Sequence, residues 1–166
     1  MKKIAVINDL SGFGKCSLTA AIPVISALGL ECCPMPTAVL SNQTGFESFY
    51  CDDFTDKMDF FTSEWKKLGV RFDGILTGFI ASHRQAEKIF RFLDEFQNDD
   101  TVFFCDPVMA DDGQIYDIYD KAMCDAVTRL AKRADIISPN LTELCVLTGE
   151  SYEVLSSSDP DDIAKA

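Results

Sequence analysis

Short apolar runs alternate with longer amphipathic stretches along this chain, and this alternation restricts its fold more than any other feature. The β-branched and aromatic composition of four runs predicts strands, and the helical spacing between them predicts helices. The predicted strands are residues 4–7, 74–77, 101–105 and 135–138, and the predicted helices are 15–28, 53–68, 83–97, 119–133 and 141–147. Residues 31–40 are expected to form an edge or irregular strand, because Pro34 and Pro36 exclude a helix there.

Strands that alternate with helices of this length predict right-handed βαβ crossovers. The expected fold is therefore α/β, with a mainly parallel sheet flanked by helices on both faces. A chain of 166 residues is long enough for one domain with a substantial core and too short for two ordinary domains. Residues 151–166 are polar, and we expect them to form a frayed tail of this single domain.

The negative charge of the chain excludes some classes of binding partner. Its 27 acidic and 15 basic residues give a net charge of −12, which repels nucleic acids and anionic membranes. No apolar stretch is long enough to cross a bilayer, and the apolar run at residues 4–7 is too short for a secretory signal, so we expect a cytoplasmic protein. With so acidic a chain, a phosphate-containing substrate needs a divalent cation and backbone amides to compensate its charge.

The cysteines and the histidine exclude several kinds of site. There are seven cysteines, without C-x-x-C spacing, and those in apolar runs such as Cys105 and Cys145 are expected to be reduced and buried. His83 is the only histidine. Neither a histidine-based metal cluster nor a Ser-His-Asp triad is therefore expected.

Polar or glycine residues follow four of the predicted strands directly. In parallel sheets, ligands bind beyond the carboxyl ends of the strands, so these residues are candidates for a shared site. Each of them could also be an ordinary helix cap, since Asp and Asn are common at that position. The candidates are Asn8 and Asp9, Gly78 and Phe79, Asp106 and Pro107, and Pro139 and Asn140.

The segment NDLSGFG, residues 8–14, is predicted to be a turn before the first helix. It resembles a phosphate-binding P-loop only superficially, because that pattern needs a glycine where Asp9 stands and Ser or Thr where Cys16 stands. What remains is a turn in which Gly12 and Gly14 let the backbone approach another group closely. Lys15 is either part of a site or simply solvated.

Three further segments carry candidate site residues. A fully apolar strand ends at Asp106, whose carboxylate is placed to orient a hydrated cation near nucleotide phosphates. Asn140 and Glu143 could share that metal, or they could be the cap and the first-turn acid of a helix. In the loop SNQTGF, Gln43 and Thr44 either contact a small polar ring compound or only form a turn.

In this order the segments resemble the ribokinase-like superfamily, and within it the kinases that phosphorylate vitamin B6. SNQTGF resembles the substrate loop, LTGFIAS the central strand and turn, CDPVMADDGQIY the Asp-Pro-Val segment and ISPNLTEL the Pro-Asn-x-x-Glu segment. The resemblance implies ATP-dependent transfer of the γ-phosphoryl group to the 5′-hydroxymethyl group of pyridoxal, pyridoxine or pyridoxamine. It also implies Mg²⁺ and a monovalent cation as cofactors, and a homodimer for the complete enzyme.

The resemblance assigns roles to individual residues as well. It implies that Asp9 and Thr44 hold the polar groups of the pyridine ring and that Phe79 lies against the ring. It implies that Asp106 and Glu143 arrange the metal. The implied substrate-binding residues are Asp9, Gln43, Thr44 and Phe79, and the implied nucleotide-binding residues are Asp106, Ser138, Asn140 and Glu143.

Two departures qualify this assignment. The segment with Gly12 and Gly14 also resembles the hydroxymethylpyrimidine kinases, so that substrate class stays open. The family's catalytic base is the aspartate of a Gly-x-Gly-Asp motif whose amides form the anion hole, and the 166 residues contain no such motif. We therefore expect a truncated ribokinase-like domain without a catalytic residue, with little kinase activity alone. A non-catalytic α/β module that binds a small molecule is the remaining alternative.

Overall fold

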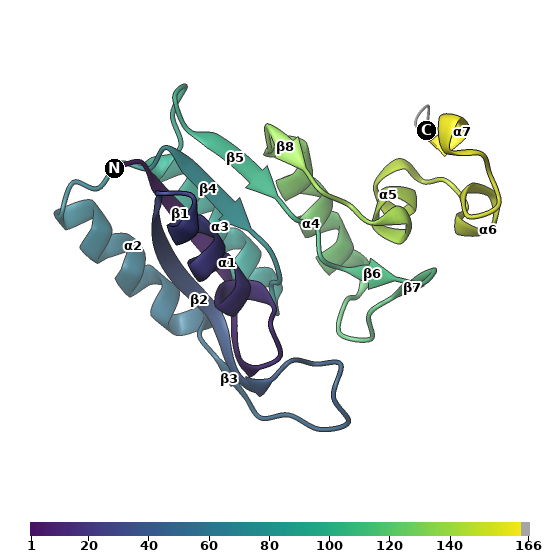
Figure 1. The fold of residues 1–166 in the computed structure, drawn as a ribbon, viewed down its shortest axis with the longest axis horizontal. Coiled ribbons are helices and arrows are strands. Elements are labelled where there is room, and N and C mark those ends of the chain that lie inside the picture. The colour runs from purple at the N-terminus through teal and green to yellow at the C-terminus, as the bar shows by residue number, and fades with distance from the viewer. Residues whose placement is uncertain (164–166) are drawn as a thin grey trace.

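A six-stranded sheet in the order β3-β2-β1-β4-β5-β8 runs through the computed structural model, which describes residues 1–163 (Figure 1). Neighbouring strands are parallel, except that β3 is antiparallel to β2. A separate antiparallel hairpin contains two further strands. The strands are β1 (Lys3–Phe13), β2 (Glu31–Asn42), β3 (Cys51–Asp53), β4 (Gly74–Thr77), β5 (Val102–Cys105), β6 (Ala110–Asp111), β7 (Gln114–Ile115) and β8 (Ile136–Ile137).

Helices alternate with these strands and cover both faces of the sheet. One face carries α1, and the other carries α2, α3 and α4 (Figure 1). The predicted α/β fold with a mainly parallel sheet is confirmed. The helices are α1 (Ser17–Ala27), the 3₁₀ helix η1 (Thr55–Lys57), α2 (Met58–Lys67), α3 (His83–Phe96), α4 (Lys121–Arg133), α5 (Leu141–Thr148), α6 (Tyr152–Leu155) and α7 (Pro160–Ile163).

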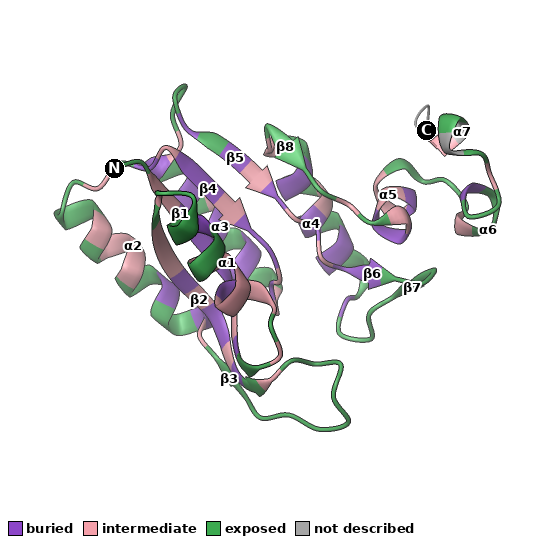
Figure 2. Ribbon diagram, viewed as in Figure 1, coloured by how far each residue is buried: buried purple, intermediate pink, exposed green. Residues whose placement is uncertain are grey.

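The alternation of side chains along each strand divides the core into two parts. In β1, Ala5 and Ile7 belong to the larger part, beneath α2, α3 and α4, whereas Val6 packs with Leu18 and Ile25 beneath α1. In Figure 2 the buried residues are concentrated in the central strands and in α3 and α4. Because both are covered on both faces, the middle of β1 and the end of β4 are held rigidly in the centre of the sheet.

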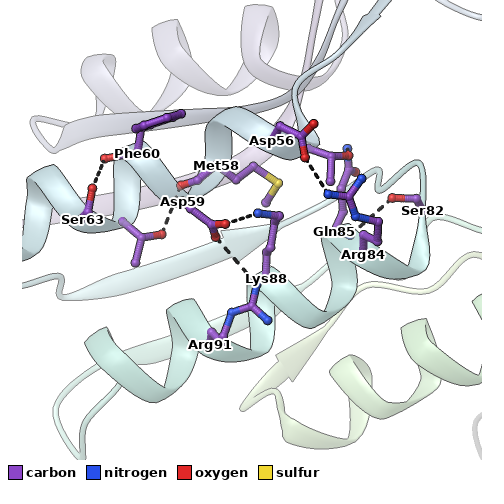
Figure 3. A network of polar contacts seen from close by, with 12 residues as sticks. Asp56, Met58, Asp59, Phe60, Ser63, Ser82, Arg84, Gln85, Lys88 and Arg91 are labelled. Carbon is purple, nitrogen blue, oxygen red and sulfur yellow. Dashed lines mark hydrogen bonds and ion pairs between the residues drawn. The ribbon is translucent and has the colours of Figure 1, made fainter.

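A polar network joins α2 and η1 to α3 (Figure 3). Lys88 of α3 is 8% exposed and forms an ion pair with Asp59 of α2. Arg91 lies 3.7 Å from the same carboxylate. One turn earlier on α3, Arg84 donates to Asp56 at 2.6 Å. These contacts fix α3 against α2 and η1.

The structure corrects the prediction at the first loop. The segment NDLSGFG is not a turn, because β1 continues to Phe13 and pairs with β2 as far as Asn42. The register shifts by one residue between Asn8 and Leu10, because β2 has two residues, Thr37 and Ala38, opposite Asp9, which makes a β-bulge in β2. Propensity alone predicted a turn here, and strand pairing overrides it.

A second correction concerns residues 53–68, which were predicted to be one helix. Residues 51–53 form the short strand β3, and η1 precedes α2, which begins only at Met58. The edge prediction for the proline-containing strand is confirmed for its first half. Because β3 pairs only with residues 38–40 of β2, Pro34 and Pro36 lie where β2 has no second neighbour.

The prediction for the end of α5 is confirmed, and the prediction of buried cysteines is confirmed for some of them. Gly149 ends α5 with φ of +82°, as predicted for a helix C-terminus. All seven cysteines are free, but only Cys105, Cys124 and Cys145 are buried, and Cys51 is exposed. None of the helices within residues 1–163 is long and apolar enough to cross a membrane. The segment expected to fray contains α6 and α7, and residues 164–166 lie outside the described part of the chain.

Candidate functional site at the strand ends

The carboxyl ends of β4, β5 and β8 lie in one row, beside the middle of β1. Backbone hydrogen bonds continue one residue past the strands and tie each end to its neighbour. These bonds run from the Gly78 amide to the Ile7 carbonyl (3.1 Å), from Asp106 to Thr77 (2.9 Å) and from Ser138 to Cys105 (3.2 Å). The residues that follow the predicted strands are therefore neighbours along a single edge, as a shared site requires.

Asp9 is held in this row by its own strand. Its side chain is buried, at 6% exposure, and one carboxylate oxygen accepts a hydrogen bond from Ser11 Oγ at 2.9 Å. The other oxygen has no hydrogen-bond partner within residues 1–163. The Asp9 amide donates to Asn8 Oδ1 at 2.9 Å, which fixes the backbone at the bulge. Asp9 thus offers one carboxylate oxygen to a ligand.

The loop after β4, residues 78–81, is held by side chains from four different parts of the chain. The Phe79 amide donates to Asn8 Oδ1 (2.9 Å), and Thr37 Oγ1 donates to the Phe79 carbonyl (3.1 Å). Tyr119 Oη donates to the Ile80 carbonyl (2.7 Å), and the Ala81 amide donates to Gln85 Oε1 (2.8 Å). The backbone of this loop is therefore held in place next to Asn8, and the half-buried Phe79 ring lies near the ring of Tyr119, with 6.4 Å between their centroids.

Sequence reasoning missed three of these supporting residues, namely Thr37, Gln85 and Tyr119. A usable signal existed for Gln85, because it falls on the buried face of α3 together with Ile89 and Phe96. A lone amide in an apolar helical stripe indicates a buried hydrogen-bonding task. No comparable signal marked Thr37 or Tyr119, whose roles depend on long-range contacts.

Asp106 lies at the end of β5, where the sequence placed it. Ser138 Oγ donates to Asp106 Oδ1 at 3.3 Å, so two of the expected nucleotide-binding residues are in contact. Burial raises the pKa of Asp106, and the hydrogen bond from Ser138 opposes that shift. The second carboxylate oxygen has no hydrogen-bond partner in the described chain. Asp106 is therefore a carboxylate that a nearby cation would stabilise.

Asn140 and Glu143 form a capping box at the start of α5. Asn140 Oδ1 accepts from the Glu143 amide at 2.9 Å, and Glu143 Oε2 accepts from the Asn140 amide at 2.9 Å. Asn140 Nδ2 also donates to the Ala110 carbonyl, and Glu143 Oε1 accepts from the Met109 amide. The interpretation of both residues as helix-capping groups is thus confirmed, and their hydrogen bonds anchor the loop after β5.

The pKa of Glu143 depends on its burial and on the nearby charge of Asp106. Glu143 is 3% exposed, and burial raises its pKa, with a further contribution from the nearby charge of Asp106. Hydrogen bonds from Asn140 and Met109 oppose this shift. Within residues 1–163, no group of three or more His, Cys, Asp or Glu side chains is arranged to hold a metal ion. A cation at this position would therefore keep much of its water.

Gln43 and Thr44 are not brought into contact with Asp9 or Phe79. Both are exposed, in the loop after β2, and the Gln43 amide donates to the Phe13 carbonyl at 3.0 Å. Phe13 is four residues beyond Asp9, or about 13 Å at the usual strand rise. A hollow of about 370 Å³ near this loop is lined by Phe13, Asn42, Phe46, Glu47 and Ser48.

The predicted close approach at the two glycines is present, but it is to another part of this chain. A Cβ at Gly12 would lie 3.0 Å from the Ser41 carbonyl oxygen, and one at Gly14 would lie 2.9 Å from Gln43 Cγ. Gly14 also has φ of +101°, which favours glycine. Both glycines therefore let β1 approach the end of β2, and Lys15 is exposed.

Comparison with known proteins places this arrangement in a family. A sequence model of the phosphomethylpyrimidine kinase family matches residues 14–166. Pyridoxal kinase PdxY of Aliivibrio fischeri is 26% identical over 93% of this chain. A Bacteroides thetaiotaomicron protein named as a phosphomethylpyrimidine kinase is 43% identical over 99% of the chain, with a TM-score of 0.94. The pyridoxal kinase of Lactobacillus plantarum is 30% identical over 98% of the chain, with a TM-score of 0.87.

The chain spans only part of these relatives. It covers 56% of the Aliivibrio protein, 56% of the Bacteroides protein and 58% of the Lactobacillus protein. The similarity nevertheless includes nearly all of the chain, from the first strand through the Pro-Asn-x-x-Glu segment. The predicted resemblance is confirmed: this chain belongs to the phosphomethylpyrimidine kinase family and has the ribokinase-like fold.

Proposed function

We propose that this chain forms the substrate-binding half of a pyridoxal kinase, which transfers the γ-phosphoryl group of ATP to the 5′-hydroxymethyl group of a B6 vitamer. The observation that carries the proposal is that Asn8 holds the backbones of Asp9, in β1, and Phe79, after β4, side by side, on the same edge as Asp106 and Glu143. The Bacteroides relative was crystallised in one form with pyridoxal, and that structure has a TM-score of 0.91 and 43% identity to this chain.

The side chains at β1 and β4 suit a small polar aromatic ring. In this proposal the ring of pyridoxal lies against Phe79, and the free oxygen of Asp9 accepts a hydrogen bond from the ring's polar groups. Gln43 and Thr44 follow β2, next to Phe13 at the far end of β1, so they reach the same ligand only if their loop folds toward Asp9. We propose this inward movement as part of binding.

The side chains at β5 and β8 suit a nucleotide with a hydrated Mg²⁺. Both oxygens of Glu143 accept backbone hydrogen bonds, whereas Asp106 keeps one oxygen available. Asp106 would therefore bind the hydrated ion, and Glu143 would add charge nearby, with Ser138 and Asn140 at the same edge. Bound there, Mg²⁺ would neutralise charge on the phosphates. A monovalent cation in the same region is part of the proposal.

The chemistry also needs a base and an anion hole, and we assign neither to these 166 residues. Positioning and charge stabilisation dominate phosphoryl transfer, and an anion hole contributes on the order of a hundredfold or more to rate. We therefore expect this polypeptide alone to bind pyridoxal and to phosphorylate it very slowly. Isothermal titration with pyridoxal and with MgATP, followed by a coupled phosphorylation assay, tests both statements.

The outcomes of this experiment separate the alternatives. No pyridoxal binding by the folded chain would contradict the proposal. Pyridoxal binding without MgATP binding would favour a non-catalytic module that binds a small ring compound. Phosphorylation at a rate typical of kinases, about 1–100 per second, would contradict the expected inactivity of the chain alone.

A second candidate substrate is hydroxymethylpyrimidine, favoured by the family model that matches residues 14–166. The two compounds share a flat nitrogen heterocycle with a hydroxymethyl group, which is the feature that Phe79 and Asp9 would recognise. Competition between hydroxymethylpyrimidine and pyridoxal in the same titration decides which ring is preferred. Pyridoxal binding at least about tenfold tighter, a difference of roughly 1.4 kcal/mol, would support the B6 assignment.

The remaining expectations concern location and assembly. We propose a cytoplasmic protein, supported by its seven free cysteines. We also propose that the complete enzyme is a homodimer. Sedimentation of the full-length enzyme would test the homodimer, and a monomer at micromolar concentration would contradict it.

A further inference from the structure

Gln85 occupies the first turn of α3, at the end of this helix that faces the β4 loop (Figure 3). Its side chain is completely buried, with 0% exposure. The side-chain oxygen accepts from the Ala81 amide at 2.8 Å. The side-chain nitrogen lies within hydrogen-bond distance of the Thr37 carbonyl (2.8 Å), Thr55 Oγ1 (2.9 Å) and Asp53 Oδ1 (3.1 Å). One amide group thus connects α3 with β2, β3, η1 and the β4 loop.

Two of these contacts converge on the loop that carries Phe79. Gln85 bonds the Ala81 amide directly, and it bonds the backbone of Thr37, whose hydroxyl donates to the Phe79 carbonyl at 3.1 Å. Thr37 is also fully buried, and its carbonyl accepts a second hydrogen bond from the Phe54 amide at 3.0 Å. A change at Gln85 therefore leaves the Ala81 amide without its partner and removes one of the two hydrogen bonds that hold the Thr37 backbone.

Helix packing alone does not explain a glutamine at this position. The neighbouring buried positions of α3, Ile89, Phe92 and Phe96, are apolar, and a leucine would fill a similar volume. Burying an amide costs free energy of folding unless the amide is fully hydrogen-bonded. The hydrogen bonds of Gln85 go to segments that border the strand ends. The contacts therefore indicate a role in placing the loop rather than in general stability.

We propose that Gln85 is a positioning residue for ligand binding, which fixes the orientation of Phe79 for the ring of a B6 vitamer without touching the ligand. This inference rests on the proposed function. It predicts that loss of the Gln85 amide weakens pyridoxal binding more than its effect on global stability explains. The reason is that a mobile loop must be ordered at the moment of binding.

The test compares Gln85→Leu with Lys88→Met in the 166-residue chain. Lys88 is also nearly buried on α3, three residues farther along, but its ion pair with Asp59 holds α2 and does not reach the loop (Figure 3). For Gln85→Leu we expect pyridoxal affinity to fall by about tenfold or more, whereas Lys88→Met binds within about twofold of the natural sequence. Affinities are measured by titration, and stability by urea denaturation.

Amide hydrogen exchange gives a second readout that a purely structural role would not produce. In Gln85→Leu, the amides of Phe79 and Ala81 should exchange at least about tenfold faster, while amides in the middle of α3 keep their protection. Should Gln85→Leu fail to fold, Thr37→Val replaces it. That substitution keeps the Thr37 carbonyl and the side-chain shape, and removes only the hydroxyl bonded to Phe79.

Each outcome has a defined meaning. Weaker binding with selective loss of protection in the loop supports the inference. Unchanged pyridoxal affinity in Gln85→Leu, or in Thr37→Val if the first variant does not fold, overturns it. An equal loss of affinity in Lys88→Met also overturns it, since the effect would then follow from stability. No binding by the natural sequence would instead contradict the proposed function itself.

Discussion

Phe79 donates its amide hydrogen to the side-chain oxygen of Asn8 at 2.9 Å, although the two residues are 71 positions apart in the sequence. The same oxygen accepts the amide of Asp9. A single asparagine thus joins the backbones of the two residues that we assign to binding of the substrate ring. The precision of the candidate site depends on this contact and on the buried groups around it.

The first prediction concerns Gly78, which precedes Phe79. A Cβ at this position would lie 2.7 Å from Asn8 Cγ, so Gly78→Ala must displace the Asn8 side chain. We expect a loss of about 1–3 kcal/mol in the free energy of unfolding, because the core around Asn8 is closely packed. Urea denaturation measures this loss. Pyridoxal affinity should fall in the same variant.

Gly45→Ala is the matched control for this substitution. The nearest atom to a Cβ at Gly45 is 3.8 Å away, which is an ordinary contact distance. Its stability should remain within about 0.5 kcal/mol of the natural sequence. Equal stability of the two variants would show that Asn8 moves without cost, which would contradict the close fit described for Gly78.

The second prediction concerns the ion pair between α2 and α3. Asp59→Asn should destabilise the chain more than Lys88→Met, because the first change leaves the buried ammonium of Lys88 without its carboxylate. We expect about 1–2 kcal/mol for Asp59→Asn, since Asp59 itself is partly solvated, and less for Lys88→Met. Urea midpoints of the two variants give the comparison. The reverse order would mean that the aliphatic stem of Lys88 matters more than its charge.

The third prediction is a pH dependence that originates at Asp106. Burial raises its pKa, so the folded protein retains this proton to a higher pH than the unfolded chain does. Stability from this group is therefore greatest below the usual aspartate range, near pH 4, and is lost as pH rises through the raised pKa. Asp106→Asn should be more stable than the natural sequence at neutral pH, and the difference should shrink as pH falls toward about 4.

Magnesium provides the check on this prediction. If Asp106 binds the hydrated ion, millimolar Mg²⁺ should raise the thermal midpoint of the natural sequence and leave that of Asp106→Asn unchanged. Equal shifts in both proteins would place the ion elsewhere. A stability difference that is independent of pH would contradict the role of the Asp106 charge.

The fourth prediction concerns the thiols. Burial raises the pKa of Cys105 to about 11, so this thiol stays protonated at neutral pH and is shielded from reagents. Cys51 is exposed, although its pKa is also raised, by partial burial and by Asp53 and neighbouring acids. Mass spectrometry after iodoacetamide treatment at pH 7.5 should show Cys51 modified well before Cys105. Early modification of Cys105 would indicate that the end of β5 opens readily.

The sequence alone determined the order of most elements and the edge at which the site lies. The alternation of apolar and amphipathic runs predicted the parallel sheet, and β4 was predicted with its observed bounds, Gly74–Thr77. The positions of Phe79 and Asp106 beyond the ends of β4 and β5 followed from the same pattern, whereas Asp9 lies within β1. Periodicity is a local property of the chain, so a single sequence is enough to recognise it.

Only the tertiary structure decided how the residues at this edge are connected. It extended β1 through a segment whose composition predicted a turn, because pairing with β2 outweighs local propensity. It placed Gln43 and Thr44 away from Asp9, and it revealed the support of the β4 loop by Thr37, Gln85 and Tyr119. These contacts join residues far apart in the sequence, and their geometry depends on packing between elements, which no local pattern contains.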